Sequence, residues 1–154
     1  MFKILVSSCL LGYPVRYDAS SQSLQDNTLQ YWRQKNWVLP LCPEVSGGLP
    51  TPRPSAEIVD GKVLSKQGDD FTSAFELGAK KALAACLQHD IKFALLKESS
   101  PSCGSNLIYD GSHKGIKIVG QGLTASLLQQ SGIQVFSETQ LPALITAMAA
   151  SRNR

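Results

Sequence analysis

The stretch DFTSAFELGAKKALAACLQHDIKFALLKE, Asp70–Glu98, decides the fold that this sequence predicts. Apolar residues recur at helical spacing from its start to Cys86, which predicts a long amphipathic helix beginning near Asp70. The apolar run that follows at 91–98 is typical of a strand buried on both faces of a sheet. A long helix followed directly by a strand is the crossover connection that parallel pairing of strands requires.

Shorter segments on both sides repeat this alternation of helix and strand. We expect three further strands, at residues 3–8 (KILVSS), 37–42 (WVLPLC) and 133–138 (IQVFSE). Pro40 indicates that the second of these is an edge or irregular strand. We expect three further helices: 27–35 with Asn27 as N-cap, 122–132 ended by Gly132, and 141–150 with Pro142 in the first turn.

The fold class follows from this order of elements. The pair Asp60–Gly61 between two short alternating runs predicts a type I′ hairpin over 56–66. The Pro- and Gly-rich stretch 43–55 is too long for a simple connection, and we expect a functional loop there. The sequence therefore predicts a single three-layer, Rossmann-like α/β domain over 1–154 with a mostly parallel sheet and a small hairpin, ending in a C-terminal helix and basic tail at 139–154.

The bulk composition is that of an ordinary globular protein, with 154 residues, 43% apolar residues and a formal charge of +3. No dense run of Lys and Arg marks a nucleic-acid surface, and no apolar run approaches the roughly 20 residues that cross a bilayer. The N-terminal segment lacks the cleavage site and basic region of a secretory signal. We expect a cytoplasmic monomer or weak homodimer without nucleic-acid or membrane partners, whose four cysteines stay reduced.

Three of the four cysteines follow predicted strands. Cys9 closes KILVSSC, Cys42 closes WVLPLC, and Cys103 lies just beyond FALLKESSPSC. Because ligands of open parallel sheets bind outside the carboxyl ends of the strands, we expect these three thiols to converge on one crevice. Cys86 differs, since it lies on the buried stripe of the long helix, where cysteine is usually a small apolar residue.

Three converging thiols leave two kinds of metal site open. A structural zinc usually takes four ligands, often in Cys-x-x-Cys turns, and the sequence has no such turn. A catalytic zinc with three thiolates and an open position remains possible. An iron–sulfur cluster held by three cysteines would leave one iron without a protein ligand, as a Lewis acid with affinity for sulfur. The spacing of the cysteines does not separate these two alternatives.

Polar residues accompany the cysteines. Glu44 follows Cys42 by two residues, so its carboxylate should face the same crevice and could shuttle protons, although a solvated loop acid is an equal alternative. Near Cys103, hydroxyl groups could orient water or substrate, or only shape a turn. The hydroxyl groups are those of Ser99, Ser100 and Ser102, and the carboxylate of Glu98 lies just ahead of them.

The roles of the remaining charged loop residues stay open at this point. Arg16, Asp18 and Arg53 lie in loops near the cysteines, and contacts to substrate or cluster are as plausible as surface ion pairs. His89 follows the long helix, where we expect a C-cap. His113 lies in the turn YDGSHKG, and we expect it at the surface rather than on a metal.

The late segment IVGQGLTASLL nearly matches a dinucleotide-binding fingerprint. Gly120 and Gly122 would provide the tight turn and Glu138 the ribose contact. The unit from Lys117 to Glu138 is shorter than the roughly 30 residues usual for such a βαβ unit. A nucleotide-binding module on this loop therefore stays a minor alternative, and we expect the helix N-terminus to contact part of a polar substrate instead.

Four segments together resemble the small bacterial proteins of the thiouracil desulfidase family. They are LVSSCLLGYPVRYDA, CPEVSGGLPTPRPSAEI, LLKESSPSCGSNLIYDG and GQGLTASLLQQSGIQVFSE, in the same order as in the family and spanning Ile4 to Glu138. The sequence departs from the family pattern at Ala19, Ser55 and His113, none of which is a candidate ligand.

The resemblance implies a 4Fe-4S cluster on Cys9, Cys42 and Cys103, with Glu44 as the catalytic acid/base and Ser100 as the assisting hydroxyl. It implies an enzyme that binds the sulfur of a thiolated pyrimidine on the fourth iron and replaces it with water, without net redox change. The expected activity is conversion of 2-thiouracil or a close relative to uracil and sulfide. The alternatives are a zinc or iron–sulfur protein that carries sulfur without turnover, and the nucleotide-binding module. The sequence leaves free base or nucleoside, and 2-thio or 4-thio, undecided.

Overall fold

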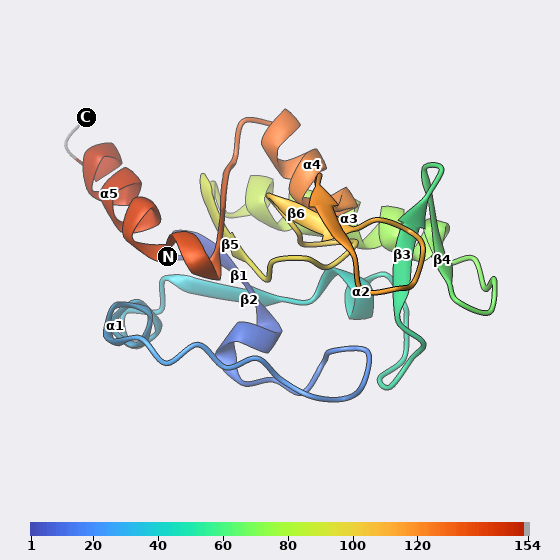
Figure 1. Ribbon diagram of the computed structural model, residues 1–154. Helices are drawn as coiled ribbons and strands as arrows, with labels where there is room; N and C mark the ends of the chain where they lie inside the picture. Colours follow the sequence, from blue (N-terminus) through green and yellow to red (C-terminus); the bar gives the residue numbers. More distant parts are fainter. Residues whose placement is uncertain (153–154) are drawn as a thin grey trace.

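The computed structural model describes residues 1–152 and contains a sheet of four parallel strands (Figure 1). The strand order is β2-β1-β5-β8, and every neighbouring pair is parallel. The strands are β1 (Ile4–Ser7), β2 (Val38–Leu41), β5 (Phe93–Leu96) and β8 (Gln134–Ser137). This confirms the predicted α/β class, and β2, which contains Pro40, lies at the sheet edge as predicted.

Helices cover both faces of this sheet. One face packs against α1 (Asn27–Gln34) and α5 (Leu141–Arg152), and the other against α3 (Thr72–Gln88) and α4 (Leu123–Gln130) (Figure 1). The side chains of β1 alternate between these two layers, because successive residues of a strand point to opposite faces. The strands β1 and β5 are buried along their whole length, as the continuous apolar runs predicted.

Two antiparallel hairpins lie outside the main sheet. The first, β3 (Ala56–Val59) with β4 (Lys62–Ser65), turns at Asp60–Gly61, where both residues have positive φ (49° and 79°), as the predicted type I′ turn requires. The second, β6 (Leu107–Tyr109) with β7 (Lys117–Val119), is a correction to the prediction of a single hairpin. Because β7 pairs only with β6 in the described part of the chain, it does not form the βαβ unit of a dinucleotide site.

A short helix, α2 (Pro43–Ser46), occupies the start of the stretch expected to be an irregular loop. Two glycines let it approach α3 closely. A Cβ atom on Gly78 would overlap the carbonyl oxygen of Pro43, and one on Gly47 would overlap the carbonyl oxygen of Ala74. The backbone contact that results fixes the position of α2, which carries Glu44.

The predicted helix ends are mostly confirmed. Gly132, in the left-handed conformation with φ 86°, follows the end of α4, and His89 is the C-cap of α3. The predicted N-cap of α1 is wrong by one residue, because the side chain of Asp26, not Asn27, accepts a hydrogen bond from the backbone N–H of Leu29.

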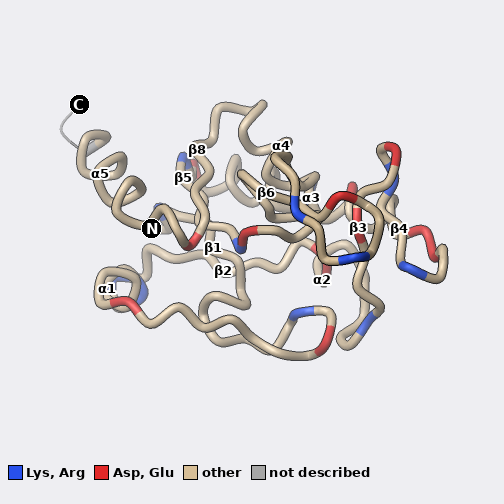
Figure 2. Tube along the Cα trace, in the orientation of Figure 1, with Lys and Arg blue, Asp and Glu red and all other residues tan. Residues whose placement is uncertain are grey.

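Two short 3-10 helices, η1 (Ser8–Leu11) and η2 (Glu138–Gln140), follow strands β1 and β8. The end of the predicted basic tail, 153–154, lies outside the described residues, and the single domain over 1–154 stays a prediction. Within the described part, no helix is long and apolar enough to span a membrane. Acidic and basic residues are mixed along the loops and helices (Figure 2).

Candidate functional site

A pocket of about 360 Å³ lies at the carboxyl ends of the parallel strands. Its wall is made from the residues that follow β1, β2 and β5, from the loop after η1, and from both hairpins. Cys9, Cys42 and Cys103 all line it. Cys86 does not, since its side chain is 0% exposed in the core between α3 and the sheet.

Each of the three thiols is presented by a different local structure. Cys9 lies in η1, and its carbonyl oxygen accepts hydrogen bonds from the backbone of Gly12 and Gln22, which fold the following loop back over it. Cys42 is the N-cap residue of α2. Cys103 lies in a turn of the loop between β5 and β6. Strand ends therefore bring together three residues that are far apart in the sequence.

Burial raises the pKa of each of the three thiols, and neighbouring cysteines add to the shift at Cys9 and Cys103. Burial raises the pKa of Cys9 to about 11, and the neighbouring Cys42 adds to this shift. Burial also raises the pKa values of Cys42 and Cys103. The hydroxyl of Ser7 donates a hydrogen bond to the sulfur of Cys103 at 3.5 Å. Metal binding at this pocket must therefore displace protons from the thiols.

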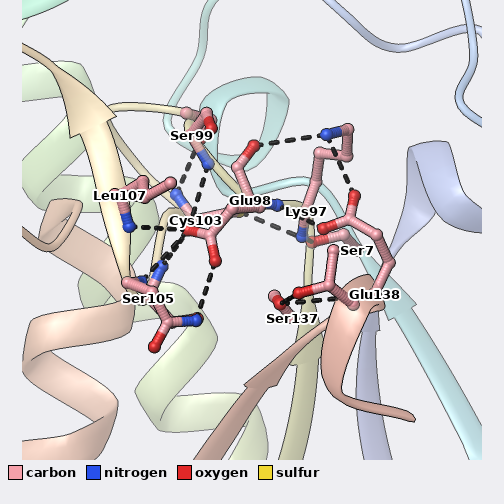
Figure 3. Close-up of polar contacts among 12 residues, drawn as sticks. Ser7, Lys97, Glu98, Ser99, Cys103, Ser105, Leu107, Ser137 and Glu138 are labelled. Carbon is pink, nitrogen blue, oxygen red and sulfur yellow. Dashed lines mark hydrogen bonds and ion pairs between the residues drawn. The ribbon is translucent and has the colours of Figure 1, made fainter. Parts of the chain in front are cut away.

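Glu98 anchors the loop that carries Cys103 (Figure 3). Its Oε1 atom accepts backbone hydrogen bonds at 3.0–3.2 Å, and its Oε2 atom accepts one from a side-chain amide at 2.8 Å. The backbone donors are Ser99, Ser105, Asn106 and Leu107, and the amide is that of Asn106. Burial alone would raise the pKa of Glu98, but these hydrogen bonds outweigh it and the pKa is lowered.

Glu98→Gln is expected to loosen this loop, because a neutral amide oxygen is a weaker acceptor for the four backbone N–H groups and the new NH2 group would face the side-chain amide of Asn106. We expect a loss of about 1–3 kcal/mol in the free energy of unfolding, measured with urea, and faster modification of Cys103 by a thiol reagent. The matched control is Glu76→Gln on the exposed face of α3. Equal stability and equal thiol reactivity in the two variants would contradict this role of Glu98.

Glu44 lies on α2 and faces the pocket beside Arg53. The Nε and Nη2 atoms of Arg53 both lie 3.1 Å from Oε1 of Glu44. The side chain of Arg53 is only 2% exposed and that of Glu44 18%, so the pair is buried and not the surface ion pair that the sequence left open. Burial raises the pKa of Glu44, with the charge of Arg53 opposing this shift.

The other two charged loop candidates differ from each other. Arg16 lines the pocket, and its guanidinium carbon lies 5.7 Å from the ring centre of Tyr17. Asp18 is exposed, and its carboxylate accepts hydrogen bonds from the backbone and hydroxyl of Ser20. Asp18 therefore shapes its own loop, whereas Arg16 is available to a bound molecule.

Two serines near Cys103 have different surroundings: one lines the pocket, and the other holds the loop in place. Ser100 lines the pocket, and its Oγ atom accepts hydrogen bonds from the backbone of Ser102 (3.1 Å) and Cys103 (2.7 Å). The hydroxyl of Ser102 is buried against that of Thr124 at 2.8 Å. The hydrogen of the Ser100 hydroxyl remains available for donation into the pocket, while Ser102 holds the loop to α4.

The N-terminus of α4 is occupied by the cysteine loop. Backbone N–H groups of Gly122, Leu123, Thr124 and Ala125 donate to carbonyl oxygens of the loop at residues 101–104. A Cβ atom on Gly122 would overlap the backbone of Ser102, so glycine allows this close approach. Glu138 accepts a hydrogen bond from the backbone of Glu98 and pairs with Lys97 at 2.9 Å. These contacts occupy the groups that a dinucleotide would need, which argues against the nucleotide-binding alternative. They also show that this helix end binds the cysteine loop, and not the polar substrate that we expected there.

The prediction that His113 lies at the surface is wrong. The side chain of His113 is only 15% exposed and lies against Glu57, with 3.6 Å between Nδ1 and the carboxylate, instead of at the open surface. Glu57 also accepts hydrogen bonds from the backbone of Gly111 and His113. It thus joins the two hairpins that form one wall of the pocket.

Several other residues line the pocket that were not among the candidates predicted from the sequence. Lys97 was recognisable in principle, because it directly follows a buried strand. Tyr109 and Lys117 belong to the hairpin that the sequence pattern did not reveal, and no signal pointed to them.

The three thiols do not form a site for a single ion. Within residues 1–152, no group of three His, Cys, Asp or Glu side chains could hold one metal ion. Each ligand of a cluster binds a different iron, so these ligands can lie further apart than the ligands of one ion.

Comparisons with known proteins cover nearly the whole chain. A profile of the family described as 2-thiouracil desulfurase matches residues 4–140. The uncharacterised protein YbbK of Bacillus subtilis (strain 168) is 41% identical over 148 residues, which cover 90% of this chain and 97% of YbbK. A solved structure described as the 4Fe-4S-dependent thiouracil desulfidase TudS matches with a TM-score of 0.96 and 51% identity, covering 97% of this chain and 99% of that one.

Proposed function

The chain belongs to the 2-thiouracil desulfurase family, and from this premise we propose that it converts a thiolated pyrimidine, 2-thiouracil or a close relative, to the corresponding uracil and sulfide. The family membership that the four sequence segments indicated is confirmed. The observation that carries the proposal is the meeting of three free thiols and a partly buried carboxylate in one pocket.

The residues present fit a 4Fe-4S cluster. The donor set consists of three thiols from three separate loops around a single pocket, and soft thiolate ligands select iron–sulfur clusters. The structural relative TudS is described as 4Fe-4S-dependent. We propose that Cys9, Cys42 and Cys103 hold the cluster. When bound, it supplies an iron without a protein ligand, a Lewis acid that polarises the thiocarbonyl group of the substrate.

The protein's own groups then handle water and protons. Glu44 accepts a proton from the attacking water at the C=S carbon, because its carboxylate faces the pocket next to the thiols. The hydroxyl of Ser100, held by two backbone N–H groups, donates a hydrogen bond into the pocket. One water replaces sulfur on carbon, its two protons leave with the sulfur as hydrogen sulfide, and no electrons are gained or lost.

The pocket volume of about 360 Å³ supports action on a small molecule, and we propose a monomer or weak homodimer. Four free cysteines support a cytoplasmic location, where thiols stay reduced.

The decisive experiment is anaerobic reconstitution with iron and sulfide, followed by incubation with 2-thiouracil. We expect a brown protein that binds iron and releases uracil and sulfide in equal amounts over many turnovers. Parallel assays with 4-thiouracil and 2-thiouridine define the substrate. One sulfur atom transferred per chain without turnover would instead support the sulfur-carrier alternative, and a protein that loads iron but leaves every thiopyrimidine intact would overturn the proposal.

A further inference from the structure

We propose that Arg53 is a positioning residue for the reaction: it holds one oxygen of Glu44 so that the other oxygen, Oε2, performs the proton transfer. This inference rests on the proposed function. It assigns a task to a residue that does not itself contact the reacting atoms.

The Arg53 side chain donates four hydrogen bonds to protein acceptors and makes one further ion-pair contact. Nε donates to Oε1 of Glu44 at 3.1 Å, and Nη2 lies 3.1 Å from the same oxygen. Nη2 also donates to the carbonyl oxygen of Val15 at 3.0 Å. Nη1 donates to the carbonyl oxygen of Pro50 and the hydroxyl of Thr51, both at 3.1 Å. The guanidinium is therefore fixed in one orientation by protein groups alone.

These acceptors belong to three separate segments of the pocket wall. Glu44 comes from α2, Val15 from the loop after η1, and Pro50 from the loop before β3. The backbone N–H of Arg53 adds a hydrogen bond to the carbonyl oxygen of Tyr17 at 2.6 Å. A single buried side chain thus sets the distance between the carboxylate and the loop that carries Tyr17.

The two oxygens of Glu44 differ in their surroundings. Both contacts from Arg53 go to Oε1, and within residues 1–152 no hydrogen bond reaches Oε2. In the same described part of the chain, no buried side-chain nitrogen or oxygen lacks a hydrogen-bond partner, so Oε2 is not sealed in the interior. Because Glu44 lines the pocket, Oε2 is the oxygen that a bound water or substrate can reach.

Lysine cannot replace arginine here. An ammonium group has three donors at one point, whereas the acceptors around Arg53 lie along a planar fork. Arg53→Lys would keep the charge next to Glu44 but release one or more of the three segments. We expect Arg53→Lys to lower kcat less than Arg53→Gln does, because lysine keeps the positive charge next to Glu44.

The test is a double-mutant cycle on reconstituted protein. The variants are Arg53→Gln, Arg53→Lys, Glu44→Gln and the combinations of Glu44→Gln with each Arg53 change, and the control is Lys80→Gln on the exposed face of α3. Each variant is measured for thermal unfolding, iron content, kcat and KM. We expect normal iron content and a fall in kcat of about 10²-fold for Arg53→Gln, because misplacing a catalytic group by about 1 Å has that effect.

The decisive readout is additivity. If Arg53 acts through Glu44, either Arg53 change should lower kcat no further once Glu44 is already glutamine. A purely structural role would give the same fold-loss in both backgrounds and overturn the inference, as would unchanged kcat in Arg53→Gln. If Arg53→Gln does not fold, the cycle with Arg53→Lys decides. A wild-type protein that loads iron but releases no sulfide overturns the proposed function and the inference with it, which distinguishes the two failures.

Discussion

Substitution of Cys9, Cys42 or Cys103 by alanine is expected to abolish both cluster loading and desulfuration. Each of these residues supplies one thiolate from a different loop of the pocket, and the other two cannot move to replace it. After anaerobic reconstitution, iron content and broad visible absorption should fall to the background of the unreconstituted protein. Sulfide release from 2-thiouracil should fall with them.

The matched control is Cys86→Ala. Cys86 is fully buried on the face of α3 that packs against the sheet, and it does not line the pocket. The Cys86→Ala variant should therefore load as much iron as the wild type. It should lose only about 1–2 kcal/mol in the free energy of unfolding, as expected for a small cavity in a core. Full iron content in any of the three pocket variants would show that the cluster has another ligand set. Loss of iron in Cys86→Ala, with full iron content in the three pocket variants, would also show that the cluster has another ligand set.

Sequence reasoning recovered the parts of the fold in which local pattern and burial agree. The strands β1 and β5 are continuous apolar runs because both of their faces are covered by helices, and α3 shows its buried stripe clearly. The turn at Asp60–Gly61 was predictable since only certain residues tolerate positive φ at both central positions.

Elements too short for periodicity escaped prediction. The helix α2 has four residues, and its position depends on backbone contact with α3 rather than on an apolar stripe. Strands β6 and β7 have three residues each, and β7 is exposed along its length, so neither shows an alternating pattern. Ala19, one of the departures from the family pattern, has a φ of 62°, a backbone conformation that favours glycine over alanine.

From the sequence, the candidate site could be predicted only where its residues directly follow strands. The rule that ligands bind at the carboxyl ends of parallel strands selected the three cysteines, and the structure brings them into one pocket. The partners of these residues were not readable from the sequence. Arg53 reaches Glu44, and Glu98 reaches Leu107, through loop conformations that no local pattern specifies. It was therefore predictable that the proposed ligands and Glu44 lie together, whereas the contacts that hold them in place were not.

Glu44→Gln is expected to retain the cluster and lose turnover. Glutamine has nearly the same shape, and its amide oxygen can still accept a hydrogen bond from Arg53, but it cannot take a proton from water. Removal of a general acid/base lowers rates by about 10²–10⁴-fold, so kcat should fall by that factor with iron content unchanged. The measurement is sulfide release by protein matched for iron.

Stability must be measured alongside, because the substitution leaves a buried cation without its anion. Breaking such a pair costs about 3–5 kcal/mol when it is fully buried, and the 18% exposure of Glu44 reduces that loss. Assays therefore need a temperature at which urea titration shows the variant to be folded, with Glu76→Gln as the control for loss of a surface charge.

Wild-type turnover in folded, iron-loaded Glu44→Gln would remove Glu44 from the mechanism and leave Ser100 as the pocket group to test next. If Glu44→Gln loses turnover and Glu44→Asp keeps part of it, the result would support Glu44 as the proton-transfer group. Aspartate keeps the carboxylate but shortens its reach, so partial rescue would show that both the charge and the position of Oε2 matter. That combination of requirements follows directly from a carboxylate whose other oxygen is held by a buried arginine.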